Sequence, residues 1–71
     1  MTTKHLYDGN GHYIGYYNDV GNQIYAYGDN GTYLGYYDKI SKQTFKASGG
    51  LLQINGGLEA LGYLIINNYK K

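Results

Sequence analysis

The side chains that could take part in chemistry are few and stand apart in the sequence. His5 and His12 are the only imidazoles, and neither serine is followed or preceded by a His–Asp arrangement at a readable spacing. His12 stands at the start of an expected strand, where a surface position is typical. The remaining candidates are the serines and aspartates Ser41, Ser48, Asp8, Asp19, Asp29 and Asp38. Aspartates in turns usually hydrogen-bond the backbone, so we expect no catalytic residues and no enzymatic activity.

Metal sites are equally poorly supported by the residue types. The stretch Asp8-Gly9-Asn10-Gly11 has only one carboxylate, and no glutamate follows at the bidentate position of a calcium loop. The chain has no cysteine, and two histidines cannot build a structural zinc site of the usual kind. The sequence therefore predicts no metal and no cofactor.

Charge and hydropathy restrict the partners and the location. The net charge is +1, all six basic residues are lysine, and arginine, the usual fork for phosphate and guanine, is absent. This pattern makes a nucleic-acid partner unlikely. The longest apolar run, residues 61–66, is far shorter than the roughly 20 residues of a membrane span, so we expect none. Residues 1–5 lack the apolar core of a signal peptide, which favours a cytoplasmic location.

The elements that must position any site come from a repeat. Residues 10–18, Asn-Gly-His-Tyr-Ile-Gly-Tyr-Tyr-Asn, return as Asn-Gly-Thr-Tyr-Leu-Gly-Tyr-Tyr-Asp at 30–38, twenty positions later. Asn-Gly favours tight hairpin turns, and tyrosine, isoleucine and threonine favour strands. The sequence therefore predicts one mainly β domain over residues 1–71, an antiparallel meander of two 20-residue repeats. The expected repeats are about 4–22 and 23–42, and the expected strands are 4–7, 12–18, 23–27, 32–38 and 43–47.

Alternation along these strands predicts which side chains share a face. Tyr13, Gly15 and Tyr17 should share one face, as should the equivalent Tyr33, Gly35 and Tyr37. This set is our first candidate for a binding or self-association surface, with the glycines as close-approach positions beneath the rings. The alternative face holds Tyr16, Tyr25, Tyr27 and Tyr36.

The pairing of the second hairpin follows from its turn. A two-residue loop at Asn30-Gly31 would place Tyr27 opposite Leu34, Ala26 opposite Gly35 and Tyr25 opposite Tyr36. Both faces of the sheet would then carry large apolar rings, although an antiparallel sheet with one wet face normally shows a polar side. Something is therefore expected to cover one face.

The C-terminal segment, residues 48–71, is the predicted cover. Residues 51–54 can form a strand. Residues 58–67 allow two interpretations: a short helix with an apolar stripe of Leu58, Leu61 and Ile65, or a strand in which Leu61-Gly62-Tyr63 echoes the repeat after a turn at Asn55-Gly56. We favour the strand, and either element would pack on one face of the meander.

The repeat resembles the MORN family, which places a tyrosine, a glycine and an aromatic residue at these spacings on glycine-rich hairpins. Tyr13, Gly15 and Tyr17 match, as do their equivalents in the second copy, and the resemblance covers residues 7–47. The 20-residue period is shorter than that of the family, and most of its loop glycines are missing. The resemblance implies a non-catalytic scaffold that associates with itself.

These observations favour a non-enzymatic module that binds protein and forms a homodimer. A small core without disulfide or metal gains stability from burying an aromatic face against a copy of itself. The abundance of Tyr, Asn, Ile and Lys without Arg suits an AT-rich genome, so a phage- or mobile-element-encoded accessory protein or inhibitor of a host protein is one concrete form. The alternative is a small-ligand site, in which tyrosines stack on carbohydrate or contact a quaternary ammonium.

Overall fold

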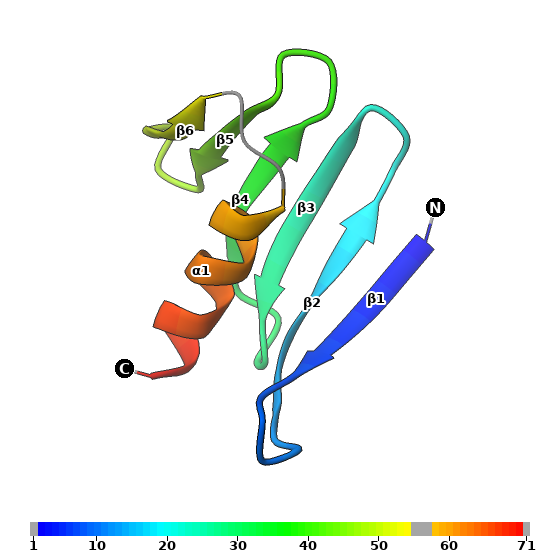
Figure 1. The fold of residues 1–71 in the computed structure, drawn as a ribbon, viewed down its shortest axis with the longest axis vertical. Coiled ribbons are helices and arrows are strands. Elements are labelled where there is room, and N and C mark those ends of the chain that lie inside the picture. Colours follow the sequence, from blue (N-terminus) through cyan, green and yellow to red (C-terminus); the bar gives the residue numbers. More distant parts are fainter. Residues whose placement is uncertain (1, 55–57, 71) are drawn as a thin grey trace.

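The fold is a six-stranded meander followed by one helix, within the residues that this computed structural model describes, 2–54 and 58–70. The elements are β1 (Thr2–Tyr7), β2 (Tyr13–Asp19), β3 (Gln23–Gly28), β4 (Tyr33–Asp38), β5 (Gln43–Lys46), β6 (Leu51–Ile54) and α1 (Glu59–Tyr69). Each strand pairs antiparallel with the next, and α1 lies across one face of the sheet (Figure 1). The predicted mainly β meander with a C-terminal cover is confirmed.

The cover is a helix, so the strand interpretation of residues 58–67 is wrong. A strand would have placed Leu61, Tyr63 and Ile65 on one side. In α1, Leu61 and Ile65 are fully buried, whereas Tyr63 turns outward and is 58% exposed. The helical period places Leu61 and Ile65 on the side that faces the sheet and Tyr63 on the side that faces solvent, so the helix buries the two aliphatic side chains together. Leu58, predicted to join the apolar stripe, is largely exposed, and the expected Asn55-Gly56 turn lies outside the described residues.

The core lies between α1 and the four strands that it crosses, β2 to β5. Two glycines at equivalent positions of the repeats let the helix approach. A Cβ on Gly15 would lie 2.8 Å from Ile65 Cγ2, and a Cβ on Gly35 would lie 2.9 Å from Leu64 Cδ1. Both glycines are close-approach positions, as predicted, but helix side chains lie over them in place of the expected tyrosine rings.

The loop of the second hairpin is one residue longer than predicted. The Gly28 amide donates to the Thr32 carbonyl, so the second loop contains Asp29, Asn30 and Gly31, with Gly31 at a φ of 86°. Gly11 takes the same role in the first loop, with a φ of 85°. A type I turn that ends in a left-handed glycine is a common three-residue hairpin loop, and only its last residue needs a positive φ.

A β-bulge follows each of these turns and restores the register. Tyr27 pairs with Tyr33 and Ala26 with Gly35, which leaves Leu34 as the extra residue. The longer loop and the bulge offset each other. The predicted pairs Ala26–Gly35 and Tyr25–Tyr36 are therefore confirmed, whereas the pair Tyr27–Leu34 is wrong.

The first repeat contains the matching bulge between β1 and β2. Leu6 pairs with Gly15 and Tyr7 with Tyr13, so Ile14 is the extra residue. A bulge adds one residue to a strand. Side chains on the two sides of the bulge therefore do not share the faces that simple alternation predicts. The two bulges therefore decide where the tyrosines point.

Candidate functional site

The two bulges divide the predicted site residues between the two faces of the sheet. Tyr17 and Tyr37 lie on the face under α1: Tyr37 is buried in the core and Tyr17 packs against it. Tyr13 and Tyr33 pair with Tyr7 and Tyr27, which point to the opposite face. The expectation that Tyr13 shares a face with Tyr17, and Tyr33 with Tyr37, is therefore wrong.

The face opposite the helix gathers nine aromatic rings, which we call the aromatic face. It contains the whole alternative set of tyrosines, joined by rings from β1, β2, β4 and β5. Ring contacts connect its members into one unbroken chain in the order Tyr7, Tyr13, His5, Tyr16, Tyr27, Tyr33, Tyr25, Tyr36 and Phe45. The chain spans β1 to β5.

The rings contact their neighbours in two ways. Tyr16 and Tyr27 stack with centroids 4.9 Å apart and planes 12° apart, and Tyr36 and Phe45 stack at 5.1 Å and 21°. The contacts between these pairs are tilted, for example 5.7 Å and 54° between Tyr27 and Tyr33. Such cross-strand pairs stabilise a sheet and hold its side chains in fixed orientations. The aromatic face is consequently preorganised for contact.

The phenol groups on this face can take part in hydrogen bonds. The Tyr13 hydroxyl lies 3.2 Å from His5 Nδ1, and the Tyr25 hydroxyl donates to Gln23 Oε1. Desolvation raises the pKa of Tyr13 and of Tyr33 above the ordinary value of 10.0, and neighbouring tyrosines add to both shifts. The face therefore combines apolar rings with polar hydroxyl tips.

Charge is almost absent from the aromatic face. Lys4 pairs with Tyr17 and Lys46 with Gly35, so both lysines belong to the helix side of the sheet. Among the residues of β1 to β5, Asp38 is the one charged side chain on the aromatic face. Its carboxylate accepts hydrogen bonds from the Ile40 and Ser41 amides of the adjacent turn. The centre of the face is thus uncharged.

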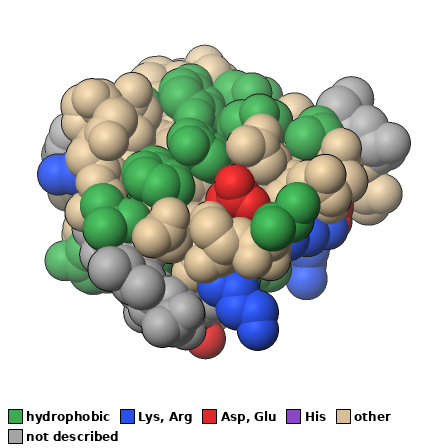
Figure 2. All heavy atoms as spheres, turned by 90° about the horizontal axis from the view of Figure 1, so that it is seen from above, with side chains coloured by type: hydrophobic (Ala, Val, Ile, Leu, Met, Phe, Trp, Pro, Cys, Tyr) green, Lys and Arg blue, Asp and Glu red, His purple; other side chains and the backbone are tan. Residues whose placement is uncertain are grey.

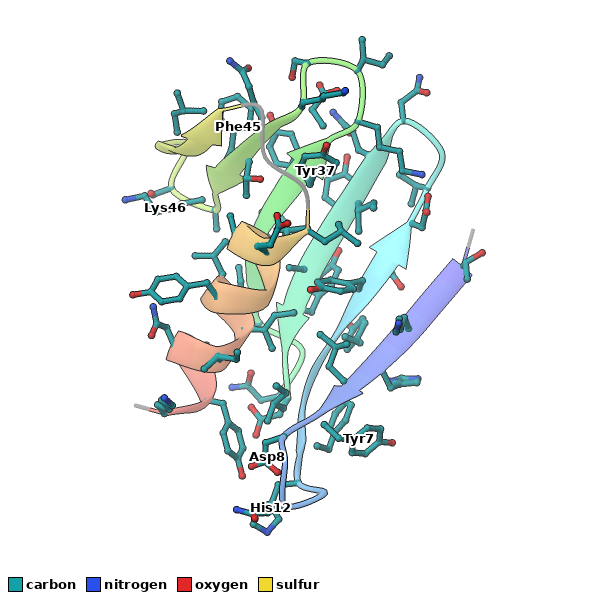
Figure 3. The ribbon with its side chains drawn as sticks, in the orientation of Figure 1. Tyr7, Asp8, His12, Tyr37, Phe45 and Lys46 are labelled. Atoms are coloured by element: carbon teal, nitrogen blue, oxygen red, sulfur yellow. The ribbon has the colours of Figure 1, made fainter. Side chains whose placement is uncertain are left out.

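The aromatic face is an open surface. Tyr7 is 60% exposed and Tyr33 38%, and the residues that the structure describes form no pocket. Figure 3 shows Tyr7 and Phe45, the two ends of the ring chain, near opposite ends of the sheet. Figure 2 looks onto one end of the molecule, where hydrophobic side chains lie side by side around an acidic side chain and the lysines lie toward the outline.

Charged side chains outside the aromatic face form hydrogen bonds and ion pairs in the turns. The Asp8 carboxylate accepts from the Asn10 and His12 amides, and its other oxygen lies 3.4 Å from His12 Nδ1. Lys39 pairs with Asp19 at 2.9 Å and so ties together two neighbouring turns. Within 2–54 and 58–70, no group of three or more histidines, aspartates and glutamates is placed to hold a metal ion. These contacts give the carboxylates structural roles.

Sequence reasoning missed three members of the aromatic face: His5, Tyr7 and Phe45. His5 pairs with Tyr16, and Phe45 pairs with Tyr36. Both strands were predicted, so extending the cross-strand pairing from the repeats to β1 and β5 would have found these two residues. Tyr7 depends on the bulge, which simple alternation does not predict.

The chain matches no protein-family model, no curated protein and no solved structure. The resemblance to MORN repeats therefore stays a prediction. The described part of the chain has no helix long and apolar enough to span a membrane.

Proposed function

We propose that this chain is a non-catalytic β module that binds protein through its aromatic face. The observation that carries the proposal is the unbroken chain of nine rings across β1 to β5, on the face opposite α1. The centres of protein interfaces are enriched in aromatic residues and depleted of lysine and acidic residues. Stacked rings that hold one another in place also lose little conformational freedom on binding.

The geometry favours a protein over a small ligand. Sugar stacking and cation–π contact both need an open ring face. In the pairs Tyr16–Tyr27 and Tyr36–Phe45, ring faces already lie against each other. Four of the nine rings therefore have one face covered by a neighbouring ring, and the described residues form no pocket that could enclose a small ligand. We expect titration with choline or simple sugars to leave the tyrosine resonances unshifted.

The same surface is poorly suited to nucleic acid. Single-strand binders combine stacking rings with a positively charged track for the backbone. The strand lysines, Lys4 and Lys46, lie on the other side of the sheet from the rings. We expect no binding to oligonucleotides even at low salt. A cytoplasmic accessory protein or inhibitor carried by a phage or plasmid is one form of the proposed function, and its support is compositional.

A photo-crosslinking experiment tests the proposal directly. A photoreactive phenylalanine analogue replaces Tyr16 on the aromatic face, and the matched control replaces Tyr63, the exposed tyrosine of α1. We expect covalent protein adducts from position 16 and few from position 63 when the variants are illuminated in a bacterial lysate. Equal labelling from both positions, or no protein adduct from position 16, would contradict the proposal.

A further inference from the structure

We propose that the protein bound on the aromatic face is a second copy of this chain. The two sheets would pack face to face, and the two α1 helices would lie on the outer sides of the pair. This inference rests on the proposed function, because it names the partner of the same surface. Three features of the face support it: its charge, its area and the position of its central rings.

Charge favours a copy over a charged partner. The carboxylates near the face lie at its margin: Asp38 at the end of β4, and Asp29 in the loop between β3 and β4, whose charge helps to raise the pKa of Tyr13. The centre of the face is uncharged, so a charged partner surface would lose its hydration there without gaining an opposite charge. A second copy brings the same uncharged rings and amides, including Asn18 and Gln23, which pair with Tyr25 and Asp38 on this side of the sheet. Like-charge repulsion, which usually opposes self-association, is minimal here.

The area of the face fits a weak, specific dimer. Five strands spaced by about 4.8 Å and about six residues long cover a footprint of roughly 24 by 20 Å, or about 500 Å². Two copies would bury about 1,000 Å² in total, which is near the lower limit for a specific interface. Contacts of this size belong to the weak, transient class, so we expect association in the micromolar range.

Two-fold symmetry places the central strand at the axis. An isologous contact uses the same patch on both copies, and β3 is the middle strand of the five that carry rings. Sheets that pack in this aligned way lie about 10 Å apart and cross at about 30°. Tyr25 and Tyr27 of one copy would then lie against the same residues of the other.

The exposed side of α1 is a weaker candidate for self-association. Its exposed apolar residues, Tyr63, Ile66 and Tyr69, belong to a single helix of 11 residues. One short helix buries less area than a five-stranded face, and polar or charged neighbours such as Asn67 and Lys70 interrupt it. Tyr63 therefore serves as the control position in the experiment.

Sedimentation equilibrium of the purified chain tests the proposal. The chain mass is 8.0 kDa, so we expect the average mass to approach about twice that value as the concentration rises through the micromolar range. Tyr33→Lys places a charge on the face at a 38% exposed position and should weaken association at least about thirtyfold. Tyr63→Lys, at a 58% exposed position of α1, should leave it unchanged.

A second measurement keeps the proposal testable if Tyr33→Lys does not fold. In a mixture of isotope-labelled and unlabelled wild-type chains, we expect intermolecular NOEs at the rings of Tyr25 and Tyr27. A wild-type chain that stays monomeric near 100 μM, or NOEs confined to the α1 residues, would overturn the proposal. A monomer whose position 16 still crosslinks to another protein would refute self-association and leave the proposed function standing.

Discussion

Replacing Gly35 with alanine should strongly destabilise the fold, because the new Cβ meets both the sheet and the helix. It would collide with the Phe45 carbonyl oxygen and lie 2.9 Å from Leu64 Cδ1. Gly35 also has a φ of 156°, a conformation that residues with a side chain rarely adopt. The substitution therefore combines backbone strain with overpacking beneath α1.

The magnitude follows from these two contributions. Strain at such a backbone position costs about 1–2 kcal/mol, and overpacking a filled core costs about 1–3 kcal/mol. The expected loss is about 2–5 kcal/mol, against a total stability of about 4–10 kcal/mol for a 71-residue chain. The melting temperature should fall by at least about 10 °C.

Two glycine controls separate the contributions in urea and thermal unfolding. Gly31 has a φ of 86° but open space around it, so Gly31→Ala should lose only the strain, about 1 kcal/mol. Gly9 has neither a positive φ nor a neighbour within 4 Å, so Gly9→Ala should be neutral or slightly stabilising. If Gly35→Ala loses no more stability than Gly31→Ala, the close packing of α1 over this glycine is refuted.

Three further changes test other features of the fold by urea denaturation. Thr44 Oγ1 is buried without a hydrogen-bond partner among the described residues, so Thr44→Val should stabilise by about 1 kcal/mol; a loss of stability would show that the hydroxyl is paired. Lys42 has a φ of 57°, so Lys42→Gly should stabilise the fold by up to about 1 kcal/mol; a loss of stability would show that Lys42 is not strained in this turn. Desolvation raises the pKa of Tyr17 and Tyr33 above 10.0 in the folded state. The unfolded chain therefore loses these phenol protons at a lower pH than the folded chain does. The free energy of unfolding should be unaffected below pH 10 and should fall as the pH rises through the folded-state pKa values. A free energy of unfolding that stays constant through this alkaline range would contradict the raised pKa values.

Much of the meander could be predicted from the sequence because its signals are local. Tyrosine-rich runs between Asn-Gly turns predict strands, and the 20-residue repeat predicts their number and order. The six observed strands agree with the predicted ones to within two residues at each end. The pairs Ala26–Gly35 and Tyr25–Tyr36 were also predictable, because the longer loop and the bulge offset each other.

The face of the sheet on which Tyr13 and Tyr33 lie could not be predicted by simple alternation. An extra residue at Ile14 and at Leu34 moves Tyr13 and Tyr33 to the aromatic face. Alternation assumes a regular ladder, and a bulge is a departure from it that tertiary packing helps to select. Here each bulge brings its extra residue to the helix side, where Ile14 is buried and Leu34 packs against the core.

The helix was the less favoured of the two interpretations of residues 58–67 for a related reason. Leu61-Gly62-Tyr63 repeats the spacing of Leu34-Gly35-Tyr36, so local similarity favoured a strand. The deciding interaction is nonlocal: Ile65 and Leu64 fill the space above Gly15 and Gly35, which lie far from them in the sequence. Only the assembled sheet offers that surface to a helix.

A dilution series of ring-selective NMR spectra tests the central claim, that the aromatic face is the interaction surface, most directly. If the face binds a second copy, the ring signals of Tyr16, Tyr25 and Tyr27 should shift or broaden as the concentration rises. Those of Tyr63 and Tyr69 on α1 should stay constant. The account would be contradicted if the ring signals of the aromatic face stayed constant, both with rising concentration and on addition of a lysate, while the signals of α1 changed.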